Sequence, residues 1–174
     1  MTAIAGSVFT AAQFNTFLRD NLSECPAAKA TTPGAHFAVS ATNQVAERIP
    51  QQQSVNTSES TSSTSFADLA TTGPTVTVTT GSSALIFATA EIGNSTASAP
   101  GRVGVDITGA TTETPDGNHV LRQESSGTAE FQRCTVARLH TALTPGVNVF
   151  KLMYAVVGVS TATFGTRNIA VIPF

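Results

Sequence analysis

The C-terminal part of the sequence is a succession of short segments in which apolar and polar residues alternate. The clearest are 75–79 and 101–107, where valine or isoleucine occupies every second position. A period of two places the apolar side chains on one face of a β-strand. Longer, mostly apolar runs follow at 84–92, 147–157 and 163–174. Turn signals such as Asp116-Gly117 separate these segments. About seven or eight strands and no helical period predict an antiparallel β-sandwich, with a jelly roll as the expected topology.

The charge content excludes several classes of partner. Charged residues make up 11% of the chain, the net charge is −2, and the nine Lys and Arg are not clustered. A nucleic-acid backbone or an anionic membrane surface would require a basic patch, so neither is an expected partner. The sequence also lacks an apolar run of the roughly 18 residues that a membrane span needs.

Composition divides the chain into three parts. Residues 51–65 are rich in Ser, Thr and Gln, with Val55 as the only aliphatic residue. Such a stretch buries too little apolar surface to offset its ordering entropy, so it is predicted to be a linker. This places an N-terminal helix and extended arm at residues 1–50 and the β head at 66–174.

The N-terminal part contains one predicted helix, Thr10–Leu22. Thr10 and Gln13 have the spacing of a capping box, and Phe9 and Phe14 that of a hydrophobic staple. The apolar residues that follow at helical spacing are Phe14, Phe17, Leu18 and Leu22. About three turns are too few for a stable isolated helix, so this stripe must dock, either on its own domain or on another protein.

The last two strands predict an oligomer because both of their faces are apolar. A sandwich strand in a monomer normally keeps one polar face. A symmetric oligomer, most simply a homotrimer, would cover the second face, although the helix or arm of the same chain is an alternative. The predicted interface residues are Val149, Met153, Ala155, Val157, Ile169, Val171 and Phe174.

Patterns typical of catalysis or cofactor binding are nearly absent. His36, His119 and His140 lack metal-ligand spacing, and no nucleophile elbow or phosphate-binding glycine loop occurs. The carboxylates that could pair for glycoside cleavage show no distinguishing spacing; they are Glu91, Asp106, Glu113, Asp116, Glu124 and Glu130. Cys25 and Cys134 are expected to be free thiols. We therefore expect a non-enzymatic protein without metal or cofactor.

Both ends of the chain resemble a known group of proteins. Gly6–Leu22, with its TAAQ-aromatic-Asn start and its RDN end, resembles the N-terminal segment of fibre-like and minor tail proteins of tailed bacteriophages and prophages of actinobacteria. In those proteins a PAKATTPG stretch and an ANxxAER stretch follow, and Pro26–Gly34 and Ala41–Arg48 are similar to them. Leu143–Phe150 and Arg167–Phe174 are similar to the closing strands of the β heads in the same proteins.

The resemblance implies a virion structural protein, of minor tail, fibre-like or capsid-decorating type. Its partners would be other capsid or tail proteins, with the N-terminal helix as the anchor and the linker holding the head away from the particle. The alternative is a head that binds a host receptor or surface glycan through the loops Gly93–Gly101 and Thr108–Asn118, which are rich in small polar residues. A cell-wall hydrolase is a third class with less support.

Overall fold

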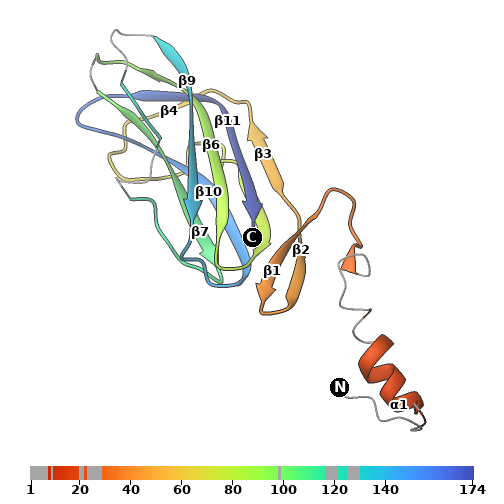
Figure 1. Cartoon of the computed structure of the whole chain (residues 1–174). Coiled ribbons are helices and arrows are strands. Elements are labelled where there is room, and N and C mark those ends of the chain that lie inside the picture. Colours follow the sequence, from red (N-terminus) through yellow and green to blue (C-terminus); the bar gives the residue numbers. More distant parts are fainter. Residues whose placement is uncertain are drawn as a thin grey trace. The chain divides into compact units, whose positions relative to one another are not determined.

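The structure is a computed structural model that describes residues 8, 10–19, 22, 29–97, 99–116, 121–124 and 130–174 (Figure 1). The chain is mainly β, with antiparallel sheets and one short α-helix, as the alternating pattern predicts. It divides into two compact units, residues 1–47 and 48–174.

The first unit begins with α1 (Ala11–Phe14), which continues as a π-helical turn, η1 (Asn15–Arg19). The capping box is formed: the backbone N–H of Gln13 donates to Thr10 Oγ1 at 3.2 Å, and the N–H of Thr10 donates to Gln13 Oε1 at 3.0 Å. Strands β1 (His36–Ala41) and β2 (Gln44–Arg48) then form a two-stranded sheet.

The second unit contains two antiparallel sheets (Figure 1). Its strands are β3 (Gln51–Val55), β4 (Glu59–Thr61), β5 (Thr75–Thr80), β6 (Ala84–Asn94), β7 (Gly101–Gly109), β8 (Leu121–Gln123), β9 (Phe131–His140), β10 (Gly146–Val156) and β11 (Ala162–Pro173). One sheet has the order β3-β11-β6-β9, with β4 also paired to β11, and the other has the order β5-β10-β7-β8.

The inward faces of both sheets contribute to one hydrophobic core. From the first sheet, β6 supplies Ile86 and Ile92; from the second, β10 supplies Phe150 and Leu152. These side chains are at most 2% exposed and lie at alternate positions of their strands. The period of two in the sequence therefore corresponds to the two sides of each sheet.

The segment predicted to be a linker contains two strands instead. β3 pairs with β11 from Gln51↔Val171 to Val55↔Arg167, and β4 pairs with the start of β11. The side chain of Asn168 donates to Gln52 Oε1 and to Ser54 Oγ, both at 2.7 Å. The polar composition is misleading because β3 lies at the end of the sheet and is held by ladder and side-chain hydrogen bonds rather than by apolar burial.

β11 changes phase part-way along its length. Its pairing with β6 is irregular between Gly165 and Asn168, and Thr166 has φ 44°. Before this bulge Ala162 and Phe164 face the core; after it Arg167, Ile169 and Val171 do. One extra residue thus reverses which positions of the strand point inward.

Candidate interaction surfaces

The predicted anchor residues that the structure describes are exposed. Phe14 is 49% and Leu18 45% exposed, four residues apart on the helical segment, and Leu22, which lies after that segment in the sequence, is 67% exposed. Phe9 and the side chain of Phe17 lie outside the described residues. Exposed large apolar groups in a row are typical of a surface that docks on a partner.

The two sequence stretches on which the resemblance depends contact each other. The carboxylate of Glu47 in β2 accepts hydrogen bonds from the backbone N–H groups of Thr31 and Thr32, both at 2.8 Å, and from the Thr31 hydroxyl. The ammonium of Lys29 donates to the carbonyl of Val45 at 3.3 Å. The hydrogen bonds from the Thr32 and Thr31 N–H groups and the Thr31 hydroxyl lower the pKa of Glu47 to about 2.

The predicted oligomer interface is corrected by the structure at three positions. Ala155, Ile169 and Val171 are 0% exposed within the single chain. Ile169 and Val171 face the core because of the bulge, so the outward residues of β11 are Ala170 and Ile172. Val149 and Met153 are half-buried, whereas Val157 and Phe174 are exposed.

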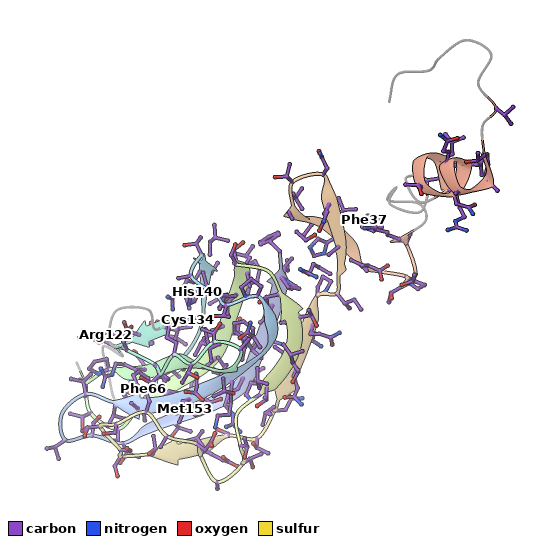
Figure 2. All side chains as sticks on the ribbon, turned by 90° about the horizontal axis from the view of Figure 1, so that it is seen from below. Phe37, Phe66, Arg122, Cys134, His140 and Met153 are labelled. Atoms are coloured by element: carbon purple, nitrogen blue, oxygen red, sulfur yellow. The ribbon has the colours of Figure 1, made fainter. Side chains whose placement is uncertain are left out.

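The outward apolar face of β10 is covered by its own chain around Met153. Phe66 lies over β7, where an added Cβ on Gly104 would approach the ring to 3.0 Å, and Met153 is the partner of Gly104 across the ladder. Arg102 stacks on Phe66, with its guanidinium carbon 5.2 Å from the ring centre. Figure 2 labels Phe66 and Met153 on this part of the head. The segment is held in place because Ala67 exchanges both backbone hydrogen bonds with Tyr154.

The outward face of the β3-β11-β6-β9 sheet carries an apolar block that the sequence interpretation missed. It consists of two rows across three strands: Ile172, Leu85 and Leu139 in one row, and Ala170, Phe87 and Ala137 in the next. Leu139 is 58% exposed, and Leu85, Phe87 and Ile172 are half-buried. The mostly apolar run 84–92 indicates apolar residues on both faces of this strand, but it does not reveal which strands lie beside it. We call these six residues the outer block.

The same face becomes polar away from the outer block. The hydroxyls of Thr89 and Thr135 are 2.8 Å apart, and Glu91 pairs with Arg133 at 3.4 Å. At the far end the Phe131 ring lies over Gly93, where an added Cβ would be 2.7 Å from the ring. The face therefore has an apolar end, a hydroxyl-rich middle and an end with one charge of each sign.

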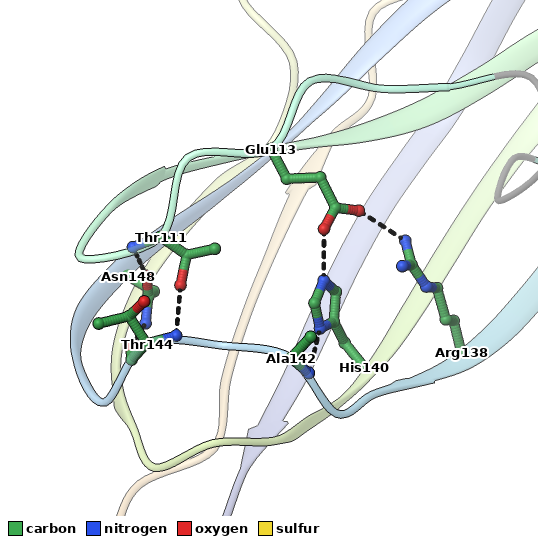
Figure 3. A network of polar contacts seen from close by, with 7 residues as sticks. All are labelled: Thr111, Glu113, Arg138, His140, Ala142, Thr144 and Asn148. Carbon is green, nitrogen blue, oxygen red and sulfur yellow. Dashed lines mark hydrogen bonds and ion pairs between the residues drawn. The ribbon is translucent and has the colours of Figure 1, made fainter.

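A polar network holds the loop after β7 against the end of β9 (Figure 3). Glu113 accepts from Arg138 at 3.1 Å and contacts His140 Nε2 at 2.7 Å. The N–H of Ala142 donates to His140 Nδ1 at 3.2 Å, so Nδ1 accepts and Nε2–H donates to Glu113. Partial burial raises the pKa of Glu113, but the hydrogen bonds and charges of His140 and Arg138 outweigh it and hold the pKa below its ordinary value.

A second part of the network is centred on Asn148, which is fully buried. Its Oδ1 accepts from the N–H of Thr111 at 2.7 Å, and its Nδ2 donates to Thr80 Oγ1 at 2.8 Å and to the Thr144 carbonyl at 3.1 Å. Thr144 N–H donates in turn to Thr111 Oγ1 (Figure 3). The described part of the loop 108–118 is thus held rigidly by the strands beneath it.

The chemistry available to these groups is structural. Both ring nitrogens of His140 are engaged, and Glu91, Glu113 and Glu124 each pair with a different arginine. Within the described residues, no three His, Cys, Asp or Glu side chains lie close enough to hold a metal ion. Over the same residues, no helix has the length and hydropathy needed to cross a membrane. The Cys134 thiol is free and contacts Gln123, whereas Cys25 and His119 lie outside the described residues.

No protein-family model matches the chain, and no curated protein matches it.

Proposed function

We propose that the chain is a non-enzymatic structural protein of a bacteriophage virion, either a minor tail or fibre-like protein or a capsid decoration. The N-terminal unit attaches it to the particle, the β head faces outward, and the heads associate with one another. The homotrimer expected from the sequence stays a prediction. The observation that carries the proposal is the contact of Glu47 with Thr31 and Thr32.

This contact joins the PAKATTPG-like stretch to the ANxxAER-like stretch. Lys29, Thr31 and Thr32 belong to the first, and Val45 and Glu47 to the second. Two stretches that make one set of hydrogen bonds are expected to occur together, because each supplies the donors or acceptors that the other uses. The resemblance at the N-terminus thus corresponds to a physical unit, as expected of an attachment module.

We also propose that the head is a β-sandwich of jelly-roll type. In support, consecutive strands change sheet at every step from β5 to β11 except between β7 and β8, which pair with each other, and the chain returns to pair β11 with β3. Two four-stranded orders of this kind, joined by long crossings between sheets, are those of a double Greek key. A rigid head of this type is suited to exposure on a particle surface.

Attachment would use the exposed row Phe14, Leu18 and Leu22. Burying such side chains contributes roughly 25 cal/mol for each Å² of apolar surface removed from water. Several anchors on one oligomer would add avidity without new contacts.

The test is incorporation into particles. In phages that carry the full-length chain, Phe14→Asp combined with Phe17→Asp should abolish incorporation, measured as copies per purified particle. The matched control is Ala12→Asp with Thr16→Asp, which adds the same charge on the opposite side of the same segment and should be incorporated normally. Wild-type copy number in the Phe14 and Phe17 variant would contradict the proposal.

A receptor- or glycan-binding head is the second candidate function. The observation that favours it is the hydrogen-bonded loop at Thr111 and Glu113, because a preorganised loop loses less entropy on binding. Binding of the purified full-length chain to host cells or cell-wall glycan, lost on substitution within residues 108–116, would support this candidate. Cell-wall turnover in the same assay would point to a hydrolase instead.

A further inference from the structure

The outer block gives the head an apolar sheet face of defined position. It lies on three neighbouring strands, β11, β6 and β9, with Leu85 and Phe87 at its centre. The side chain of Leu139 is 58% exposed, so the outer block is accessible to a partner. By contrast, Phe66 covers the part of the outward face of the other sheet around Gly104 and Arg102. The two sheets of the head thus differ in what covers them.

We infer that a second copy of this chain packs on the β3-β11-β6-β9 sheet, face to face about a two-fold axis that lies between the two sheets and runs parallel to β6. The axis brings Leu85 and Phe87 of one copy against the same residues of the other. This deepens the self-association in the proposed function and assigns a pair in place of the homotrimer expected from the sequence. It concerns the purified chain and holds whether or not the protein belongs to a virion.

Sheet geometry favours an identical partner. Sheets that pack face to face keep their strands within about 30° because both have the same right-handed twist. A second copy of the chain presents a sheet with the same twist. An irregular or helical partner would match the surface only at the six residues of the outer block.

The charges on the face favour the same partner. Glu91 and Arg133 form a pair of opposite sign on one edge of the face, and the Thr89 and Thr135 hydroxyls are already hydrogen-bonded to each other. The face therefore has no net charge that would select a basic or an acidic partner. A neutral surface is compatible with an isologous contact, in which the same patch of two copies meets.

The available area is sufficient for a stable pair. Four strands at about 4.8 Å spacing are roughly 19 Å wide, and the 11 residues of β6 extend for about 37 Å. The face thus measures about 700 Å², close to the roughly 800 Å² that each partner contributes to a standard interface.

The experiment measures the mass of the full-length chain by sedimentation equilibrium over a wide range of concentrations. We expect the wild type to reach the mass of two chains. Leu139→Glu should raise the dissociation constant at least about a hundredfold, because each dimer contains the substitution twice and buries two carboxylates. Ala137→Glu, in the second row of the outer block, should act in the same direction.

The matched control is Val147→Glu on β10. Val147 is 55% exposed, also lies on a strand, and belongs to the other sheet. It should leave dimerisation unchanged, and circular dichroism should show that all three variants are folded.

Three results would overturn the inference: a wild type that is monomeric throughout, equal effects of Leu139→Glu and Val147→Glu, or a trimer that Leu139→Glu does not dissociate. Because this test uses no particle, its failure is separate from failure of the incorporation test.

Discussion

The guanidinium carbon of Arg167 lies 5.3 Å from the centre of the Tyr154 ring, and both side chains are fully buried in the core of the second unit. Arg167 also donates to the carbonyl and hydroxyl of Thr57 and lies 3.7 Å from the Glu59 carboxylate. Glu59 in turn accepts from the backbone N–H of Thr71. One buried cation thus joins β11 to the segment between β3 and β5, and burial raises the pKa of Tyr154 to about 12.

We expect Arg167→Met to lower the free energy of unfolding by about 3 kcal/mol, because the buried acceptors lose their donor while the apolar volume is largely kept. Urea unfolding of the full-length chain would measure it. Arg122→Met is the control: its ion pair with Glu124 is exposed, so the change should stay below about 0.5 kcal/mol. Equal effects of the two substitutions would contradict the role assigned to Arg167.

Glu47 should titrate far below an ordinary carboxyl group. Its pKa is about 2 in the folded chain against 4.5 as the ordinary value. A lowered pKa means that the ionised group stabilises the fold above pH 4.5 and that this contribution disappears as the pH falls toward 2. The amide chemical shifts of Thr31 and Thr32 should therefore titrate with a midpoint near 2. In Glu47→Gln these two amides should lose that titration, and a midpoint near 4.5 in the wild type would show that the contact does not form in solution.

Asn148 should be essential to the loop network. In Asn148→Leu the N–H of Thr111, the carbonyl of Thr144 and the hydroxyl of Thr80 lose a buried partner. We expect a loss of about 3 kcal/mol, since each unsatisfied buried group costs about 1–3 kcal/mol and part of this is recovered by relaxation. Asn148→Asp also removes the donor and places a buried carboxylate beside the Thr144 carbonyl, so at neutral pH it should lower thermal stability at least as much as Asn148→Leu. A wild-type unfolding temperature in Asn148→Leu would refute this description.

Phe66 should protect the outward face of β10. Phe66→Ala removes the ring that lies over Gly104 and Arg102, so we expect a loss of about 2 kcal/mol and faster oxidation of Met153 by peroxide. Peptide mass spectrometry would follow the oxidation, with Phe131→Ala on the other sheet as the control. An unchanged rate at Met153 in Phe66→Ala would mean that the face is covered by something else.

The positions of the strands follow closely from local pattern. The segments expected at 75–79, 84–92 and 101–107 correspond to β5, β6 and β7 within two residues. Side-chain alternation and turn residues are local properties, so a single sequence is enough to locate them. The capping box of Thr10 and Gln13 is local in the same way, and it is present as expected.

The polar strand β3 and the buried faces of the apolar strands could not be predicted from local pattern. β3 reads as a linker because hydrogen bonds to β11, supplied by a segment more than a hundred residues later, replace apolar burial. The predicted interface contains Ile169 and Val171 because a strand with two apolar faces does not reveal which one is inside. The bulge at Gly165 and the cover provided by Phe66 settle that question, and both depend on contacts between distant segments.

Local sequence thus specifies where this chain extends and turns, because those preferences depend on neighbouring residues. The choice of core face, the closure of β10 by Phe66 and the exposure of the outer block come from the assembly of the sheets. They are decided by strand order and register, which depend on free energies summed over the whole core rather than on any one segment.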